Sequence, residues 1–504
     1  MKKKDTFIQS FARFAHDTRY EDIPQSVVQK VKLQVLNCLT AMKFSDWHPD
    51  ALKIFDAEKK QDAGNGGSTV IAINEKLDAE RAAIVNTAFA MSLDFDDYML
   101  MGHMSHSSVI PALALLEEKN GEMRELIVAA TAANEVMGRL ALSCFFGPLN
   151  GQMWSYVHHL GAATALARVK NLDRTRMANA MGLSLYQPNF CLFPGFWTEG
   201  CKLLTAAMPA RVGIQAVKYA EEGLQGPLDV IEGDFGFLHF FSFHPIKEML
   251  GDLGDAWLSE TLSYKRYPGT SYIGGPVDAA LAALNELGIE KIEDVNDIKK
   301  ILVETTVFSN SMEQIAKKQV HREVNSILIN FSVSHSVAYA LLQGDLLPPH
   351  FKEEEIKKYK DRITELVKKI EVRHDMGMTA RTFSTIPQVA RIFKRMKLGE
   401  LRRLSSHLRA MRTSKRSFIS MLKGLIKFIS NPYGRVLAKN FFRRDTKPIN
   451  LVDMNLPDFP MYQSARAIIT LENGKTAISE FLIPRGGAGI DLETRKKWVE
   501  KRFE

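Results

Sequence analysis

The chain has 504 residues, 45% of them hydrophobic and 25% charged, with a net charge of +8, so it can bury a large core in two or three domains and is not globally disordered. No run of eighteen apolar residues is present, and we expect no transmembrane span. The four cysteines are far apart without metal-ligand spacing, which predicts buried thiols in a cytoplasmic protein and argues against a zinc site.

Helical periodicity dominates the first half of the chain. Apolar residues recur at helical spacing in four long windows, at 24–43, 107–118, 122–147 and 201–223. The last segment, 491–503, is again helical. We therefore expect an all-helical domain formed by residues 1–262 and 485–504.

The pattern changes from about residue 263. β-Branched residues alternate in part at 299–308 and 366–374, and 464–483 predicts two strands around an Asn473-Gly474 turn. Helical windows at 277–288 and 331–343 lie between these strands. The predicted fold class is mainly α with an α+β part, in which a smaller α+β domain occupies 263–484.

A basic segment interrupts the α+β domain. Residues 391–447 hold seventeen Lys or Arg and two acids, a balance of +15, so the rest of the chain carries −7. Apolar residues recur at helical spacing between the basic ones, which predicts amphipathic helices in an insertion at about 375–455. We favour a solvated basic face packed on the α+β domain, with a membrane surface or another anionic partner as the alternative. No nucleic-acid partner is expected, because no recognised motif accompanies the charge.

The densest chemistry lies in the segment LDFDDYMLMGHMSHSSVIP, residues 93–111. It places three aspartates and two histidines within thirteen residues, directly before an apolar helix: Asp94, Asp96, Asp97, His103 and His106. Carboxylates and imidazoles are the side chains that transfer protons near neutral pH. Packing does not explain five of them in one short turn-rich segment. The segment therefore indicates an enzyme.

Four segments, in this order, resemble the MmgE/PrpD family, which includes 2-methylcitrate dehydratases, cis-aconitate decarboxylases and an iminodisuccinate epimerase. They begin LDFDDY at 93, TEGCKLLTAAMPARVG at 198, LSYKRYPGTSY at 262 and VHREVNSILINFSVSHS at 320. The resemblance covers roughly residues 5–372 and 456–503. It implies a large all-helical domain with a smaller α+β lid domain, an active site in the cleft between them, a homodimer, and neither a metal nor an organic cofactor. The family's chemistry is proton abstraction next to a carboxylate, followed by loss of water, loss of CO2 or reprotonation.

The family's motifs carry over residue by residue, with departures. Its D-F-D-D-T matches the segment from Asp94, with Tyr98 in place of Thr, and its H-P-S histidine matches His106, two residues further along. The lysine of T-K-x-L-H matches Lys202, and that of K-R-F/Y-P-x-H matches Lys265. Three family histidines are replaced here, by Gln152, Thr205 and Thr270.

The resemblance implies catalytic roles for Asp94, His106, Lys202 and Lys265. His106, oriented by Asp94 or Asp97, is the expected general acid or base, with helix capping as its structural alternative. Both lysines are expected to bind substrate carboxylates and stabilise an enolate, and burial could lower a lysine pKa enough for it to act as the base. His103 is expected at the surface or lining the site. The substrate-binding candidates, the last three of which have packing roles as alternatives, are Asp97, Gln152, Thr205, Thr270, Tyr267, Tyr272 and His335.

The resemblance and the retained residues together predict a cofactor-independent, dehydratase-like lyase that acts on a small carboxylate by α-proton abstraction and β-elimination. A decarboxylase or epimerase of the same family is the first alternative, because each needs the same enolate stabilisation. A binding or scaffold protein that has lost catalysis is the second. The replaced histidines favour that alternative, and the retained His106, Lys202 and Lys265 oppose it. The lost histidines would also leave room for a larger or thioester-linked acid.

Overall fold

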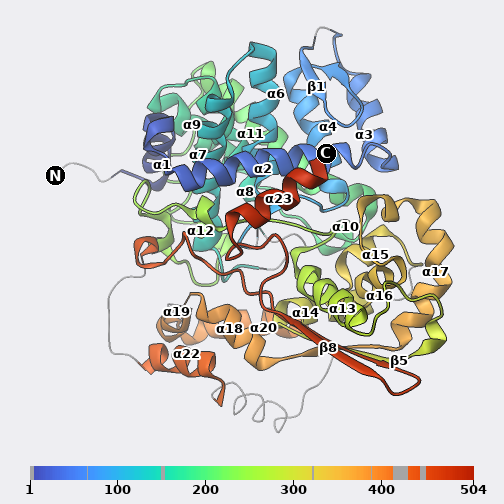
Figure 1. Ribbon diagram of the computed structural model, residues 1–504. Helices are drawn as coiled ribbons and strands as arrows, with labels where there is room; N and C mark the ends of the chain where they lie inside the picture. The colour runs from blue at the N-terminus through green and yellow to red at the C-terminus, as the bar shows by residue number, and fades with distance from the viewer. Residues whose placement is uncertain are drawn as a thin grey trace.

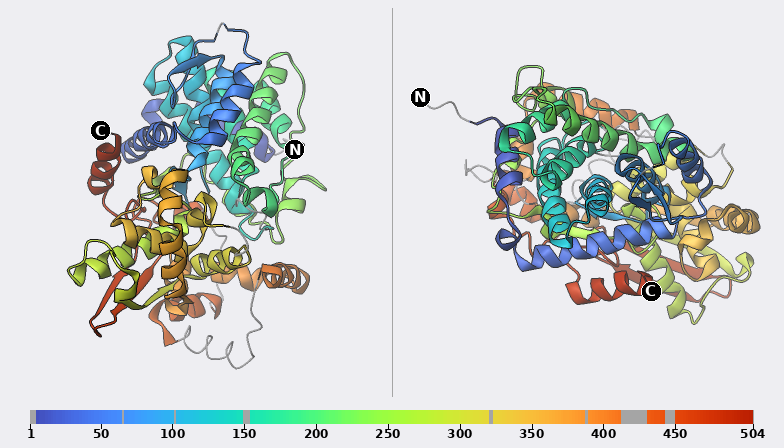
Figure 2. Two further views of the ribbon diagram at one scale, coloured as in Figure 1. Left: turned by 90° about the vertical axis from the view of Figure 1, so that its right-hand side faces the viewer. Right: turned by 90° about the horizontal axis from the view of Figure 1, so that it is seen from above.

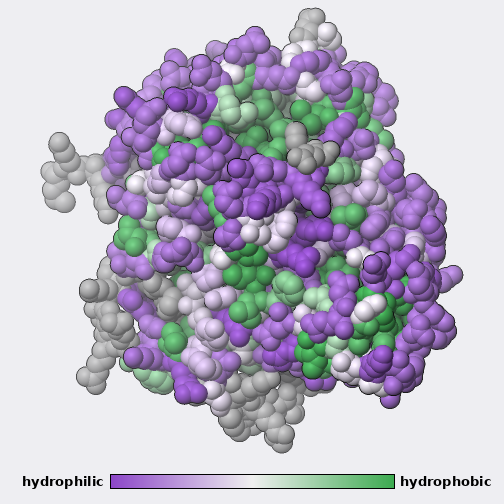
Figure 3. All heavy atoms as spheres, in the orientation of Figure 1, coloured by the Kyte–Doolittle hydropathy of each residue, from purple (hydrophilic) through white to green (hydrophobic). Residues whose placement is uncertain are grey.

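The computed structural model describes residues 5–64, 66–100, 102–148, 154–319, 323–386, 389–411, 430–442 and 450–503. A large helical domain is joined to a smaller α+β domain, as the sequence predicts (Figures 1 and 2). The face seen in Figure 3 is mostly hydrophilic, with small apolar patches, one of them at the level where the two domains meet.

Three helices, α7, α8 and α11, form the core of the helical domain, and its other helices pack around them. Its helices are α1 (Phe7–Asp17), α2 (Gln25–Lys43), α3 (Pro49–Lys59), α4 (Ala79–Ser92), α5 (Ser105–Ser108), α6 (Ile110–Lys119), α7 (Met123–Ser143), α8 (Val157–Val169), α9 (Arg174–Leu185), α10 (Phe193–Phe196), α11 (Glu199–Glu221), α12 (Phe237–Phe241) and α23 (Leu492–Phe503). The C-terminal helix α23 returns to pack on α2. In the described part of the chain, α7 is the one helix long and apolar enough to cross a membrane, but it is fully buried in this domain and is a core helix.

Glycines let the core helices approach closely. A Cβ added at Gly161 of α8 would lie 2.0 Å from the Met137 sulfur of α7. A Cβ at Gly213 of α11 would lie 2.4 Å from the His159 carbonyl oxygen of α8. Because real Cβ atoms do not come so near, larger residues at these positions would push the helices apart. The close packing fixes α8, which carries His158 and His159, against the helices that hold the candidate site.

Two short strand pairs were missed by the sequence analysis. Strands β1 (Ser68–Val70) and β2 (Glu75–Leu77) form one antiparallel pair, and β3 (Asp97–Met99) and β4 (Leu262–Tyr264) form another. Three residues are too few for a strand to show alternation in its sequence. The second pair matters for function, because its register sets Asp97 opposite Tyr264 and so brings the aspartate segment beside Lys265.

The α+β domain contains a four-stranded sheet in the order β6-β5-β7-β8. Its strands are β5 (Ile298–Thr305), β6 (Ile370–His374), β7 (Ala465–Leu471) and β8 (Thr476–Phe481). Its helices are α13 (Gly274–Glu286), α14 (Val307–Lys317), α15 (Ser326–Phe331), α16 (Val333–Gln343) and α17 (Glu353–Lys368). β6 runs parallel to β5, while β7 and β8 form the predicted antiparallel hairpin, whose turn places Gly474 at a φ of +84°. The strand positions predicted from alternation are therefore confirmed to within a few residues.

The insertion bridges the two domains. Its described helices are α18 (Met376–Ser384), α19 (Val389–Arg395), α20 (Leu398–Met411) and α22 (Pro432–Phe442). Residues 387–388, 412–429 and 443–449 of the predicted insertion lie outside the described residues. Arg381 of α18 forms an ion pair with Glu480 of β8 at 3.3 Å. Ile392 of α19 is buried in the core of the helical domain, and Glu400 of α20 contacts His244 there at 3.0 Å. The insertion thus packs on both domains, not on the α+β domain alone.

Candidate active site

The turn that carries the aspartates lies where the two domains meet. Leu93 and Phe95 are buried in the core of the α+β domain, whereas Tyr98 is buried in that of the helical domain. The backbone N–H of Lys265 donates to the carbonyl oxygen of Asp96 at 3.2 Å. Asp94 adopts a φ of 54°, a left-handed conformation that Asp tolerates better than most residues. Both domains therefore fix the direction of these carboxylates.

Two buried lysines neutralise the aspartates. The Lys265 Nζ donates to Asp96 Oδ1 at 2.9 Å and to the Asp94 carbonyl oxygen at 2.9 Å, and it lies 3.4 Å from Asp94 Oδ1. The Lys202 Nζ donates to the Met91 carbonyl oxygen at 3.2 Å and lies 3.4 Å from Asp94 Oδ2. The structure thus brings together Asp94, Lys202 and Lys265, which lie far apart in the sequence. It also adds Asp96, to which the sequence analysis gave no role.

The electrostatics follow from this pairing. Burial alone would raise the pKa of Asp94, but the ammonium groups of Lys202 and Lys265 outweigh it and lower that pKa to about 2. Burial lowers the pKa of Lys202, and Asp94 offsets this only in part. For Lys265 the two carboxylates outweigh burial and raise the pKa. At neutral pH both aspartates are charged, and Lys265 stays an ammonium ion.

His103 is the histidine at the open side of this cluster. Its Nδ1 lies 2.6 Å from Asp96 Oδ2, and its Nε2 lies 3.7 Å from Asp94 Oδ1. Its side chain is 14% exposed, whereas that of Asp94 is 2% exposed and that of Asp96 is fully buried. The family motif selects His106, the histidine directly before a serine, so the sequence predicts His103 only at the surface or lining the site. Its hydrogen bond to Asp96 now makes it the better-placed proton-transfer group.

His106 lies behind His103. The two rings stack with centroids 5.5 Å apart, and His106 Nε2 is 3.4 Å from Asp96 Oδ2, so its nearest carboxylate is neither Asp94 nor Asp97. Burial lowers the pKa of His106 to about 4, although Asp96 opposes this shift. Neither ring nitrogen has a hydrogen-bond partner among the described residues. His106 is therefore neutral at pH 7 and fully buried, which fits a supporting position better than direct contact with substrate.

His158, which no family motif selects, lies close to His106 in space. Its ring centroid is 5.9 Å from that of His106, and its Nδ1 is 2.8 Å from Ser107 Oγ. His159 faces elsewhere, with Nδ1 3.0 Å from the Ser184 carbonyl oxygen. A row of three imidazoles, His103, His106 and His158, thus runs inward from the cluster. Because neighbouring residues of a helix point in different directions, the sequence alone does not show which of the two adjacent histidine rings faces the cluster.

Asp97, Thr205 and Gln152 are the other candidates from the helical domain. Asp97 accepts a hydrogen bond from Gln34 Nε2 at 2.8 Å, and burial, followed by the neighbouring Asp96 charge, raises its pKa to about 6. The Thr205 hydroxyl donates to the Lys202 carbonyl oxygen one turn earlier in α11, at 2.6 Å. Gln152 lies outside the described residues.

Three of the candidates, Tyr267, His335 and Thr270, come from the α+β domain. The Tyr267 hydroxyl donates to Asp278 Oδ1 at 2.7 Å inside the domain core, and His335 Nδ1 lies 2.7 Å from Ser332 Oγ at the start of α16. Thr270 lies nearer the cluster, four residues after the Arg266 that follows Lys265. Its backbone N–H donates to the carbonyl oxygen of Asn330 at 3.0 Å. The preceding residue, Gly269, donates its backbone N–H to the Leu93 carbonyl oxygen, next to Asp94, at 2.9 Å.

One group in the described part of the chain has the geometry of a metal site. Asp96, His103 and His106 each offer a ligand atom, and these atoms lie within 4.8 Å of one another. The Lys265 ammonium, 2.9 Å from the other oxygen of Asp96, already supplies positive charge there and disfavours a second cation. The arrangement suits proton transfer better than metal binding, and the expectation of a site without metal stays a prediction.

The comparisons with known proteins agree with this architecture. Residues 9–249 match the MmgE/PrpD N-terminal domain, and residues 267–401 match the MmgE/PrpD C-terminal domain. The chain therefore belongs to the MmgE/PrpD family.

Its curated relatives include cis-aconitate decarboxylases from a fungus and from two mammals. That of Aspergillus terreus (strain NIH 2624 / FGSC A1156) is 25% identical over 382 residues, which cover 72% of this chain and 77% of the relative. That of Homo sapiens is 24% identical over 380 residues, covering 73% and 76%, and that of Mus musculus is 21% identical over 379 residues, covering 73% and 75%. These relatives are lyase-type enzymes, which supports an enzyme of that kind here.

Proposed function

We propose that the protein is a cofactor-independent lyase that removes a proton next to the carboxylate of a small acid and then eliminates a β-leaving group. The observation that carries this proposal is the buried cluster in which Lys202 and Lys265 lie beside His103 and its partner Asp96. The cluster combines two ammonium groups that can bind a carboxylate with an imidazole, the side chain most often used for general acid–base catalysis.

The geometry supports a specific division of roles. With its Nδ1–H donated to Asp96, the His103 ring carries its lone pair on Nε2, which is the expected base for the α-proton. The Lys202 and Lys265 ammonium groups hold the substrate carboxylate and stabilise the negative charge that develops on it as the proton leaves. His103, now protonated, returns its proton to the leaving hydroxyl group, which departs as water. Asp94 acts as a positioning residue that holds both lysines.

A decarboxylase is the second candidate, and the names of the relatives favour it. Loss of CO2 produces the same kind of carbanion next to a carboxylate, and His103, after taking up a proton from solvent at Nε2, would supply the proton that replaces the carboxyl group. An epimerase needs only the proton removal and return. The scaffold alternative draws its support from Thr205, whose hydroxyl is used within its own helix and cannot titrate near pH 7 as the family histidine would.

A substrate screen tests the proposal. Citrate-like, aconitate-like and hydroxyacyl acids are incubated with the protein, and the masses of the products are measured by mass spectrometry. Loss of the mass of water supports the dehydratase, and loss of the mass of CO2 supports the decarboxylase. Lys265→Ala and His103→Gln should each abolish the activity found. The proposal fails and the scaffold alternative gains if no acid is converted or bound, or if both variants keep the wild-type rate.

The proposal includes the setting that the family resemblance implies, a homodimer in the cytoplasm. Sedimentation velocity at micromolar concentration should give a species with twice the mass of the chain. A monomer at every concentration would contradict the dimer without affecting the chemistry proposed for the cluster. One chain supplies all of its side chains, which are Asp94, Asp96, His103, Lys202 and Lys265.

A further inference from the structure

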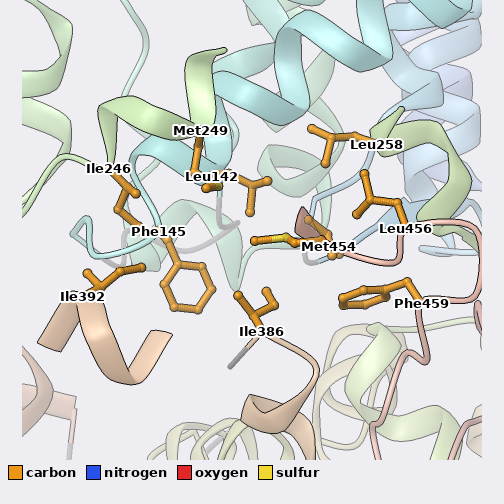
Figure 4. Close-up of a pocket in the computed structure, with 11 residues that line it drawn as sticks. Leu142, Phe145, Ile246, Met249, Leu258, Ile386, Ile392, Met454, Leu456 and Phe459 are labelled. Atoms are coloured by element: carbon orange, nitrogen blue, oxygen red, sulfur yellow. The ribbon is translucent and has the colours of Figure 1, made fainter. Parts of the chain in front are cut away.

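Two adjoining apolar cavities lie where the helical domain, the α+β domain and the insertion meet. The larger measures about 60 Å³ and the smaller about 20 Å³. Five side chains line both of them, namely Leu100, Leu142, Phe145, Ile386 and Phe459. In the smaller cavity, side chains from α7, α19 and the segment around Leu456 converge on one space, and all of them are hydrocarbon or thioether groups (Figure 4).

The cavities share a loop with the candidate active site. Leu100 directly follows β3 and lies three residues before His103. The ring of Trp154, which lines the larger cavity, covers Gly102, because a Cβ there would lie 2.8 Å from Trp154 Cε3. Leu100 and Trp154 adopt φ values of 57° and 65°, an unfavourable conformation for large side chains that tertiary packing must maintain. Leu100, three residues before His103, and Trp154, whose ring covers Gly102, therefore form part of the cavity wall.

The larger cavity also has polar groups on its α+β side. Tyr272, two residues after Thr270, lines it and stacks on Phe308 with ring centroids 5.9 Å apart. Gln463 is 4% exposed, and its Nε2 donates to Ser271 Oγ at 3.3 Å. Its Oε1 has no hydrogen-bond partner among the described residues. A buried amide oxygen without a partner is unfavourable unless a ligand brings a donor to it.

The charge of the cluster points to a substrate with few carboxylates. Lys202 and Lys265 are already balanced by Asp94 and Asp96, whose carboxylates lie 2.9 to 3.4 Å from them. The family histidines that could add positive charge are Thr205 and Thr270 in this chain. A site with so little net positive charge binds one or two carboxylates more readily than three.

We propose that the two cavities hold the hydrocarbon part of the substrate, which is a mono- or dicarboxylic acid with a short alkyl or acyl side chain. This inference rests on the proposed function and adds the substrate class. A cavity of about 10–15 Å³ accommodates one water-sized group, so the larger cavity, at about 60 Å³, has room for about four carbon atoms. The unpaired Gln463 oxygen accepts a hydrogen bond from a hydroxyl or amide group on that side chain.

A chain-length series tests the inference on the wild-type protein. Succinate and 2-alkylsuccinates from methyl to octyl are titrated in, and binding is measured by isothermal titration calorimetry. Each added methylene group should strengthen binding by about fourfold, the factor that corresponds to about 0.8 kcal/mol per buried CH2, and the gain should stop after about four carbon atoms. Equal affinity for succinate and all its alkyl derivatives would overturn the inference.

Three variants locate the binding of the alkyl group. Ile386→Trp fills both cavities and should remove the chain-length effect while succinate binding stays as in the wild type. Ile386→Ala enlarges the same space and should move the limit to longer chains, so the pair remains informative if the larger residue prevents folding. The control is Leu398→Trp, a position in the same insertion that is 67% exposed, and it should behave as the wild type.

The outcomes separate this inference from the proposed function. If succinate binds and Lys265→Ala abolishes its binding, but chain length and Ile386→Trp have no effect, the cavities do not hold the substrate and the proposed function stands. If neither succinate nor any alkylsuccinate binds, and the substrate screen finds no converted acid, the proposed function fails and the inference fails with it.

Discussion

Replacement of Lys265 by Met should cost both stability and activity, and for separable reasons. The side chain is 4% exposed, and its Nζ contacts Asp96 Oδ1 at 2.9 Å and Asp94 Oδ1 at 3.4 Å. Met has a similar volume but no charge, so two buried carboxylates lose a cation that neutralises them. Removing one partner of a buried ion pair costs about 3–5 kcal/mol, and the low exposure leaves little solvent to reduce that cost.

The stability lost in Lys265→Met should depend on pH and should be greatest at neutral pH. In the wild type the pKa of Asp94 is lowered to about 2, so its contribution to stability is present above an unfolded-state pKa of about 4 and is lost as the pH falls towards 2. Without Lys265 the pKa values of Asp94 and Asp96 rise. The difference in stability between variant and wild type should therefore be largest near pH 7 and should shrink as these carboxylates take up protons.

The assay is urea unfolding followed by circular dichroism, beside the rate of conversion of the acid found in the screen. Lys265→Met should lower the rate by about 10²–10³-fold, as expected for loss of one group that stabilises developing charge. The double variant Lys265→Met/Asp96→Asn should recover part of the stability, because it removes an unpaired charge, but none of the activity.

A matched lysine provides the control. Lys369 donates to two carbonyl oxygens, those of Val295 at 2.9 Å and Ile298 at 2.6 Å, and neither bond involves a carboxylate. Lys369→Met should cost about 1–2 kcal/mol and leave the rate unchanged. The reasoning is refuted if Lys265→Met is no less stable than Lys369→Met, or if the double variant is no more stable than the single one.

Three further predictions concern pH, metal ions and the basic segment. Burial lowers the pKa of His106 to about 4, so protonation of this group should reduce the free energy of unfolding of the wild type by up to about 3 kcal/mol between pH 6.5 and 4. His106→Asn should remove that part of the pH dependence of the urea midpoint. Equal pH dependence in the variant and the wild type would contradict this. Dialysis against EDTA should leave the conversion rate unchanged. A loss of activity that Zn²⁺ reverses would instead show that Asp96, His103 and His106 form a metal site. The exposed Leu398 and Phe442, 67% and 77% accessible beside basic side chains, favour an anionic membrane surface, so vesicles containing phosphatidylserine should retain the protein in low salt; equal retention by neutral vesicles would contradict it.

Most of the fold could be predicted because its signals are local. The helical windows at 24–43 and 122–147 became α2 and α7, and the Asn473-Gly474 turn became the hairpin of β7 and β8. The pairing of β3 with β4 could not be predicted. It joins residues more than 160 positions apart in the sequence through three-residue strands, and only tertiary packing stabilises it.

The candidate site was predictable in its composition but not in its geometry. Family motifs select Asp94, Lys202 and Lys265, and the structure places these three side chains in contact. The motifs do not determine which neighbouring aspartate turns towards the histidines, because this depends on the left-handed conformation of Asp94. As a result the sequence analysis assigned a substrate-binding role to Asp97 and none to Asp96. The motif also selects His106 over His103, whereas the structure places His103, not His106, in a hydrogen bond with Asp96.

The most direct test of the central claim, that His103 transfers the proton at the carbon next to the substrate carboxylate, is deuterium exchange in D2O. The wild type, His103→Gln and His106→Gln are incubated with each acid that the screen finds, and proton NMR follows deuterium incorporation at that carbon. We predict incorporation by the wild type, a loss of about 10²–10⁴-fold in His103→Gln, and a much smaller effect in His106→Gln. Wild-type exchange in His103→Gln, or a loss confined to His106→Gln, would contradict the account.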